Sequence, residues 1–478
     1  MVFSSLRYSV VFSSLPFLFV FAPLFFLIYS LVPVRWKNGV LLLGSLAFYA
    51  YGVWETPQYM LLLLAAILVN WRLGLHLGRG QPRRKLMLAL GLIYNIGWLV
   101  LFKYAGFFRD NLAALWGLLS RQTVSARSWE LLLPLGISFY TFQCLSYLLD
   151  VYHERVQPER SLTRMALYIS LFPKLTAGPL TSYRAISGQL RERQVTWERA
   201  EHGAKLFVLG LGFKVLLANR IGSLWSDISA IGFEGVSTPL AWMGAFAYSF
   251  QIYFDFYGYS LMALGLGQLL GFDLPENFAD PYLSRSMTEF WRRWHITLGD
   301  WFRDYVYIPL GGSRQGRGRT VRNLLIVWLL TGLWHGASWN FIFWGLLLFL
   351  LQLLERLGLG KVLERRPVFG HLYMILMIPL SFTVFSITDL SQLGIYFGRL
   401  FPFCGSWAGI MAGDYLKYGR MYGVLLLLGL LFCLPWPKKL WRRLERSPLV
   451  IPILLAIFWG AVYCLCRGMN DPFLYFRF

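Results

Sequence analysis

Residues 286–305 read S-M-T-E-F-W-R-R-W-H-I-T-L-G-D-W-F-R-D-Y, and residues 331–339 read T-G-L-W-H-G-A-S-W. Ser286 and Glu289 have the spacing of a capping box, so a helix is predicted to begin at this serine. Beyond it, apolar residues recur at helical spacing and predict one amphipathic helix with a single apolar stripe. A helix with aromatic and charged sides is typical of a membrane interface. The stripe consists of Trp291, Trp294, His295, Leu298, Trp301, Phe302 and Tyr305.

The composition is that of a membrane protein. Of 478 residues, 57% are hydrophobic and 14% charged, and the mean hydropathy is +0.52. A soluble domain could not cover so much apolar surface, which indicates an all-α polytopic membrane protein. The formal charge of +21 resides in short loops between apolar runs. This pattern indicates that the basic loops face the anionic lipids of a cytoplasmic leaflet, and it argues against nucleic acid as the partner.

No metal site is predicted, because the cysteines lack ligand spacing. They are Cys144, Cys404, Cys433, Cys464 and Cys466.

Apolar runs long enough to cross a bilayer recur along the chain. The first is predicted to be a retained helix rather than a signal peptide, because no cleavage signal is evident. The stretch 103–130 is expected to be a loop. The predicted spans lie near 11–32, 39–54, 58–75, 86–102, 131–149, 204–219, 238–257, 371–388, 421–435 and 449–466.

Two apolar segments do not fit a plain spanning helix. The run 165–182 contains F-P-K-L-T-A-G-P-L, whose prolines break a helix, and basic residues flank it on both sides. It is predicted to be a re-entrant hairpin with its backbone buried in protein. The second is 321–351. The arginine-rich segment before it and the basic segment 436–447 should both face the cytoplasm. Two half-length passes that turn near W-H-G-A, with His335 near the turn, satisfy both requirements.

Histidines provide the candidate chemistry. Burial keeps an imidazole neutral, and a neutral imidazole can take a proton from a hydroxyl. His335 is therefore a candidate general base, and the glycines beside it allow a substrate to approach. The alternative is a buried histidine bonded to a neighbouring carbonyl. His295 is a second candidate, although an interfacial helix also tolerates an amphipathic residue in its stripe.

Two further groups of residues allow both a functional and a structural interpretation. Asp255, within Q-I-Y-F-D-F-Y-G-Y-S, is an acid near membrane depth, which indicates either function or a structural partner for a nearby arginine or tyrosine. Arg314, Arg317 and Arg319 lie in a glycine-rich loop and could hold a polyanion such as a cofactor phosphate. Topology and lipid headgroups are the alternative explanation. No P-loop, G-x-S-x-G, CxxC pair or H-E-x-x-H supports ATP-driven transport, serine hydrolysis or zinc chemistry.

Several motifs together identify a resemblance. They are P-L-G-I-S-F-Y-T-F-Q at 134–143, F-P-K-L-T-A-G-P at 172–179, Q-I-Y-F-D-F-Y-G-Y-S at 251–260, E-N-F-A-D-P-Y-L at 276–283, E-F-W-R-R-W-H-I-T-L at 289–298, R-D-Y-V-Y-I-P-L-G-G at 303–312 and G-L-W-H-G-A at 332–337. With these motifs the chain resembles the membrane-bound O-acyltransferase (MBOAT) family, and within it the bacterial branch of alginate O-acetyltransferase-like proteins.

The resemblance implies a single integral-membrane domain over 1–478, with core motifs in 134–345. It implies a ring of about 11–12 tilted transmembrane helices, with re-entrant and interfacial helices, around a central tunnel. His335 would be catalytic and His295 a second polar group. Trp291, Trp294, Trp334 and Asp255 are expected to line the substrate tunnel.

The resemblance also implies the substrates and partners. An acyl thioester such as acetyl-CoA would enter from the cytoplasm as donor, with no permanently bound cofactor. The acetyl group would pass through a bacterial plasma (inner) membrane for O-acetylation of an exported polysaccharide of the alginate or peptidoglycan type. An extracytoplasmic acetyltransferase partner would complete the transfer. The alternatives are D-alanyl transfer to teichoic acid by the same fold, and a transporter of lipid or glycan without covalent chemistry.

Overall fold

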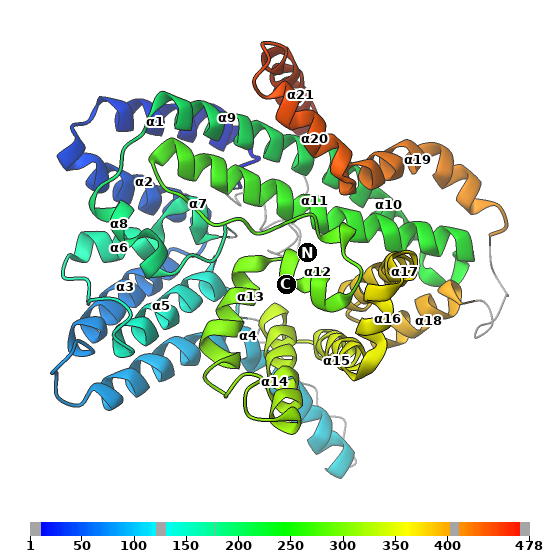
Figure 1. The fold of residues 1–478 in the computed structure, drawn as a ribbon, viewed down its shortest axis with the longest axis horizontal. Helices are drawn as coiled ribbons and strands as arrows, with labels where there is room; N and C mark the ends of the chain where they lie inside the picture. Colours follow the sequence, from blue (N-terminus) through cyan, green and yellow to red (C-terminus); the bar gives the residue numbers. More distant parts are fainter. Residues whose placement is uncertain (1–10, 121–130, 177, 402–410, 469–478) are drawn as a thin grey trace. The chain divides into compact units, whose positions relative to one another are not determined.

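The computed structural model describes residues 11–120, 131–176, 178–401 and 411–468. Its described residues form helices joined by short connections, with one isolated β-bridge (Figure 1). Contacts between Cα atoms divide the chain into two compact units. The first comprises Met1–Gly203 with Leu266–Pro275, and the second comprises Ala204–Gly265 with Glu276–Phe478. The prediction of a single domain over the whole chain remains a prediction.

Six helical segments in the described part of the chain are long and apolar enough to cross a membrane. They agree with the multi-pass membrane protein predicted from composition. The six are Gln58–His76, Arg84–Ser120, Trp197–Ile231, Trp339–Arg365, Pro367–Ser386 and Asp414–Cys433, and shorter apolar helices occupy Phe17–Leu31 and Val450–Cys466.

The first unit begins with α1, which follows a π-helical turn. Its helices are α1 (Ala22–Leu31), α2 (Lys37–Gly52), α3 (Gln58–His76), α4 (Arg84–Ser120), α5 (Ile137–Tyr152), α6 (Leu162–Ser170), α7 (Phe172–Leu175) and α8 (Tyr183–Arg191). The prediction of a loop at 103–130 is wrong for residues 103–120, because α4 continues to Ser120. Its few charged residues are separated by apolar ones at helical spacing. Residues 121–130 lie outside the described part.

The predicted break within 165–182 is confirmed. The helix α6 ends at Ser170, and Pro173 occupies the first turn of the four-residue α7. Lys174 is fully buried, and its Nζ donates to Oε1 of Gln143 at 2.9 Å. The same ammonium lies 4.1 Å from the centre of the Tyr168 ring. Protein therefore surrounds this irregular segment, as a break at membrane depth requires.

The second unit holds the motifs from 251 onward, except for the chain segment 266–275. The helix α9 (Trp197–Gly212) leads into it, followed by a π-helical turn, Phe213–Ala218. The remaining helices are α10 (Asn219–Ile231), α11 (Thr238–Leu270), α12 (Met287–Arg293), α13 (Ile296–Phe302), α14 (Arg317–His335), α15 (Trp339–Leu354), α16 (Gly360–Arg365), α17 (Pro367–Ser386), α18 (Leu390–Leu400), α19 (Asp414–Cys433), α20 (Pro435–Leu444) and α21 (Val450–Cys466).

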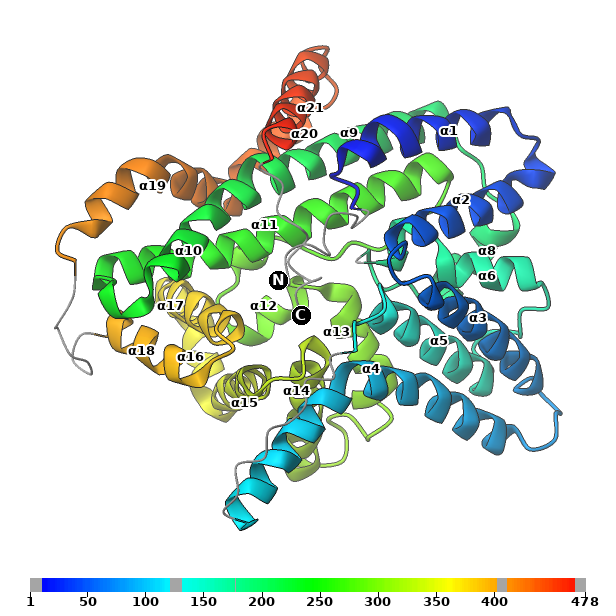
Figure 2. The same cartoon turned by 180° about the vertical axis from the view of Figure 1, so that it is seen from behind.

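The predicted hairpin is formed by α14 and α15, which lie side by side in both views (Figures 1 and 2). The turn at W-H-G-A is confirmed, since α14 ends at His335 and α15 starts at Trp339. The half-length arms are wrong, because the two helices have 19 and 16 residues. Glycines allow the close contact. A Cβ on Gly332 would lie 2.3 Å from the carbonyl oxygen of Phe341, and one on Gly345 would lie 2.5 Å from that of Trp328.

Candidate active site

The segment 286–305 is a broken helix rather than the continuous one that its apolar stripe predicted. Ser286 caps α12 as expected, with its hydroxyl accepting the Glu289 amide at 3.1 Å. The Glu289 carboxylate instead accepts the amide of Arg285, so the capping box is not reciprocal. The helix stops at Trp294, which is extended, and His295 adopts a left-handed conformation (φ 44°, ψ 52°). The helix α13 starts immediately after it.

A neighbouring strand-like segment causes the break. Phe278 and Trp294 form an antiparallel bridge, and the Ala279 amide donates to the Arg293 carbonyl at 2.9 Å. The carbonyl of Asn277 accepts the Ile296 amide at 3.0 Å, which satisfies one of the donors that a helix start leaves open. This E-N-F-A-D segment was recognised as a motif, but its pairing could not be read from helical periodicity.

The break buries His295. Its side chain is 2% exposed, and its ring lies 4.6 Å from that of Phe256, edge to face. Burial lowers the pKa of His295 to about 3, because desolvation penalises the charged imidazolium. His295 is thus a neutral imidazole at physiological pH, held by a backbone that histidine adopts only at some cost.

His335 is the last residue of α14 and is 5% exposed. Three aromatic rings surround its imidazole, with centroid distances of 4.9 Å to Trp334, 5.0 Å to Phe385 and 5.1 Å to Trp344. The three come from α14, α17 and α15, so the packing of several helices fixes the ring orientation. An imidazole held in this way keeps one orientation toward whatever occupies the space beside it, and in its neutral form it can accept a proton.

Both histidines line one cavity of about 430 Å³. The Trp334 ring, 5% exposed, packs against both imidazoles, with its centroid 6.1 Å from that of His295. The cavity brings together the predicted Trp291, Trp294, His295 and His335. Its other lining residues are Thr288, Arg292, Ile296, Leu298, Gly299, Asp300, Phe302, Arg303, Tyr307, Leu324, Val327, Trp328, Thr331, Gln352 and Arg356.

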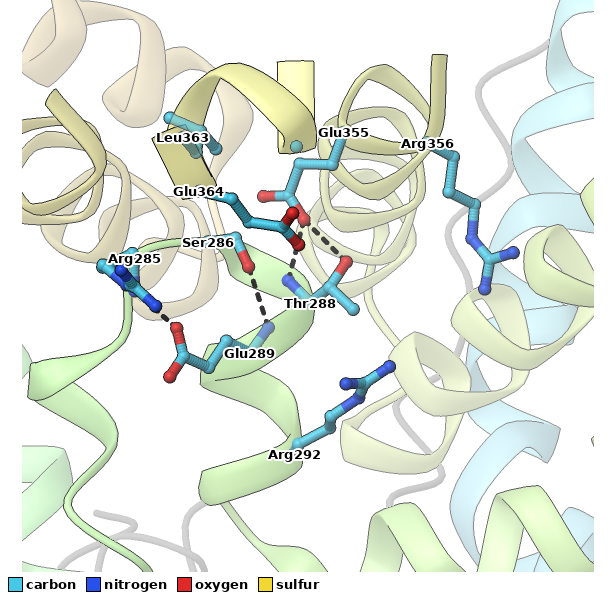
Figure 3. Close-up of a pocket in the computed structure, with 10 residues that line it drawn as sticks. Arg285, Ser286, Thr288, Glu289, Arg292, Glu355, Arg356, Leu363 and Glu364 are labelled. Carbon is cyan, nitrogen blue, oxygen red and sulfur yellow. Dashed lines mark hydrogen bonds between the residues drawn. The ribbon is translucent and has the colours of Figure 1, made fainter. Parts of the chain in front are cut away.

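A buried carboxylate holds α12 in place. Glu355, 6% exposed, accepts the Met287 amide at 2.6 Å, the Thr288 amide at 2.9 Å and the Thr288 hydroxyl at 2.6 Å. The two bonds to Thr288 are drawn in Figure 3. A carboxylate at the start of a helix is favourable, because the first amides of a helix have no partner within it. Sequence reasoning missed Glu355. Its only local signal is an acid immediately after the apolar run of α15.

A second cavity of about 530 Å³ adjoins the first and shares Thr288, Arg292 and Arg356 with it. Arg285, Arg292 and Arg356 surround it (Figure 3). Within the described residues, no hydrogen bond or ion pair engages these three guanidinium groups, whereas Glu289 pairs with Arg293 at 2.7 Å. Three glutamates, Glu289, Glu355 and Glu364, line the same space. The shared wall therefore joins a space lined by arginines and glutamates to the histidine cavity.

Arg314, Arg317 and Arg319 line neither cavity. All three are exposed, and Arg319 donates to Oε1 of Gln315 at 2.5 Å. Arg317 and Arg319 belong to the first turn of α14 rather than to a loop. Their role in donor binding stays a prediction.

Asp255 also lies outside the lining of the histidine cavity. Its Oδ1 is 2.5 Å from Nζ of Lys214, and both side chains are 1% exposed. This ion pair gives Asp255 a structural partner, a lysine, which the structural interpretation had not named. Removing one member of such a pair leaves a buried charge, which is costly in an apolar interior.

Polar residues of the cavity that sequence reasoning missed include Tyr307, Thr331 and Gln352. Gln352 accepts the indole N–H of Trp328 at 3.1 Å, and Thr331 lies one helical turn before His335. The signal for Thr331 and Gln352 is a polar residue within an apolar helix, Thr331 on α14 and Gln352 on α15. Tyr307 ends the π-helical turn Arg303–Tyr307 and has no such signal.

Comparison with known proteins places the chain in a family. The profile described as MBOAT, membrane-bound O-acyltransferase family, matches residues 159–362, a range that includes both histidines. The probable alginate O-acetylase AlgI of Pseudomonas putida is 34% identical over 94% of this chain and 96% of its own. The peptidoglycan O-acetyltransferase of Helicobacter pylori is 37% identical over 66% of this chain and 63% of its own. The teichoic acid D-alanyltransferase of Bacillus subtilis is 28% identical over 49% of this chain and 62% of its own. With similarity of this extent, the chain belongs to the membrane-bound O-acyltransferase family.

Proposed function

We propose that this protein passes an acetyl group from a cytoplasmic thioester across the bacterial plasma membrane for O-acetylation of an exported polysaccharide. The observation that carries the proposal is the single cavity lined by His295 and His335 in a member of an O-acyltransferase family. The relatives named as alginate and peptidoglycan O-acetyltransferases support acetyl as the acyl group and a polysaccharide as its final acceptor.

His335 acts as the base in this proposal. Its neutral imidazole takes the proton of the attacking hydroxyl, while the hydroxyl oxygen bonds to the thioester carbonyl carbon. The carbon–sulfur bond then breaks, and the imidazolium returns the proton to the leaving thiolate. The products are an ester and a free thiol, so protons and electrons balance. His295 is a hydrogen-bonding group beside the reacting atoms, since its buried ring stays neutral.

The second cavity supports a route for the donor. Acetyl-CoA and carrier-linked thioesters both carry phosphate groups, which guanidinium groups bind with paired hydrogen bonds. Arg285, Arg292 and Arg356 surround the space that adjoins the histidine cavity. They would hold the phosphates while the thioester reaches the histidines. Arg314, Arg317 and Arg319 would then attract the donor from outside these cavities.

A second protein completes the proposed pathway. The acetyl group leaves the membrane on an acceptor hydroxyl, and an extracytoplasmic acetyltransferase moves it to the glycan. The rival within the family is D-alanyl transfer, which the teichoic acid D-alanyltransferase similarity supports over a smaller part of the chain.

Thioester turnover tests the proposal. Purified protein in nanodiscs should release free thiol from acetyl-CoA, or from an acetylated carrier protein, when an acceptor hydroxyl is present. His335→Ala should lower the rate of thiol release by about 10²-fold or more, while the variant still binds the donor. His371→Ala is the matched control, because His371 lines neither cavity. Substrate movement that survives His335→Ala, without thiol release, would establish a transporter. Activity with a D-alanyl carrier alone would establish the rival transfer.

A further inference from the structure

The helix α20, with the sequence P-W-P-K-K-L-W-R-R-L, connects two apolar helices. The preceding α19 is one of the segments that can span a membrane, and the following α21 is apolar throughout. Leu434 is extended between α19 and α20, so the chain turns there and a new helix begins at Pro435. A polar helix between a helix that can span a membrane and a shorter apolar helix fits the place where the chain meets the membrane surface.

The exposed side of α20 combines apolar and basic residues. Trp436 is 73% exposed and Leu440 is 57% exposed, one helical turn apart. Lys439, Arg442 and Arg443 are exposed beside them, and no described residue pairs with these three cations. An apolar edge flanked by unpaired cations fits the acyl–headgroup boundary of an anionic membrane.

The remaining lysine of α20, Lys438, pairs with Asp280, and their side chains are 41% and 38% exposed. Nζ of Lys438 lies 3.3 Å from each carboxylate oxygen of Asp280. Asp280 is left-handed (φ 49°) and directly follows Ala279, whose amide is bonded to the Arg293 carbonyl. One ion pair therefore connects α20 to the segment that forms the break before His295.

We propose that α20 is a binding surface for anionic phospholipid headgroups and that the Lys438–Asp280 pair couples this surface to the position of His295. Anionic lipid neutralises Lys439, Arg442 and Arg443 and fixes α20 against the membrane. Lys438 then holds Asp280, and through it the 277–280 segment. The binding part of this proposal stands alone, whereas the coupling part rests on the proposed acyl transfer.

Binding is tested with headgroup-labelled phosphatidylglycerol and phosphatidylcholine added to the purified full chain. The variant Lys439→Gln/Arg442→Gln/Arg443→Gln should bind phosphatidylglycerol at least about tenfold more weakly, because it removes three cations that attract the anionic headgroup. The matched control is Lys361→Gln/Arg365→Gln/Arg366→Gln, which removes the same charge from exposed positions of another short connection. Equal affinity of the α20 variant and wild type would overturn the binding surface.

Coupling is tested by thiol release in nanodiscs with and without phosphatidylglycerol. Wild-type turnover should rise about threefold or more with the anionic lipid, and the α20 triple variant should not respond. Lys438→Gln and Asp280→Asn should bind the lipid like wild type but lose the stimulation, since asparagine tolerates the left-handed conformation. Inorganic phosphate should not replace the lipid. Undiminished stimulation in Lys438→Gln would overturn the coupling. Absence of thiol release under every condition would instead count against the proposed function.

Discussion

Glu355 and Thr288 are joined by two hydrogen bonds, from the amide and the hydroxyl of the threonine to one carboxylate oxygen. This contact, with a third bond from Met287, fixes the start of the helix that leads to His295. The turn at His295 therefore depends on an acid that follows the W-H-G hairpin.

Glu355→Gln tests this anchor. An amide presents only one acceptor oxygen, so at least one donor of α12 loses its partner inside the protein. We expect a loss of roughly 1–3 kcal/mol in stability, together with slower thiol release. Thermal unfolding in detergent measures the first effect. Glu364→Gln is the control, because Glu364 lines the same cavity but is exposed. Equal unfolding temperatures for the two variants would contradict the anchor.

The left-handed backbone at His295 predicts an unusual order of variants. Glycine tolerates φ near 44°, and asparagine tolerates it better than alanine does. His295→Gly should therefore be about 0.5–1 kcal/mol more stable than His295→Ala. His295→Asn should keep part of the activity, because its amide can still form hydrogen bonds. Unfolding curves and thiol release measure the two effects, and an alanine variant as stable as the glycine variant would exclude backbone strain.

Burial of His295 also predicts a pH dependence of stability. Its pKa of about 3 in the folded protein is below the usual value near 6.5, so below pH 6.5 the unfolded chain binds a proton that the folded one excludes. The stabilisation is therefore present above pH 6.5 and is lost as the pH falls toward 3. Between these two pKa values the free energy of unfolding changes by up to about 1.4 kcal/mol per pH unit. His295→Asn should flatten the dependence between pH 6.5 and 4, as measured by denaturant unfolding. Identical slopes would show that the ring is solvated.

The glycine contact in the α14–α15 hairpin predicts a steric effect. Gly332→Ala places a methyl group against the backbone oxygen of Phe341, so the helices must separate at the cost of about 1–3 kcal/mol. Both stability and turnover should fall, because His335 lies on the same helix. Gly318→Ala, also on α14, meets no atom within 4 Å and should be neutral or mildly stabilising. Similar behaviour of the two variants would rule out the tight contact.

The basic segments predict which loops of the chain face the cytoplasm. Cysteines introduced at the exposed Ser313 and Pro448 should resist membrane-impermeant maleimide added to intact cells, because both sites adjoin arginine-rich stretches expected in the cytoplasm. Labelling after cell lysis confirms that the cysteines are reactive. Rapid labelling of either site in intact cells would require a different topology.

The sequence predicted the parts of the site that depend on composition and charge. Several of the spans, the hairpin and the position of His335 near its turn follow from hydropathy and from basic segments that should share one side. The predicted spans 39–54, 131–149 and 238–257 are not among the helices of the described chain that are long and apolar enough to cross a membrane. The break at Trp294–His295 could not be predicted, because the local pattern is fully helical and the distant Phe278 decides the conformation. Glu355 and Arg356 were missed for a similar reason. Charges at a helix end indicate a membrane boundary. Only the packing of neighbouring helices and turns around α12 places these two residues at the cavity.

The shortness of α12 and α13 bears on how the protein is made. Helices of seven residues do not persist in isolation, and α12 is held by Glu355, which is encoded later in the chain. Translation proceeds at about 5–20 residues per second, so His295 leaves the ribosome several seconds before Glu355 follows. During that interval the nascent chain carries the histidine without its surroundings. Chains truncated before Glu355 should therefore neither retain a thioester nor consume it, and competence for acyl transfer arises only once the hairpin has been inserted.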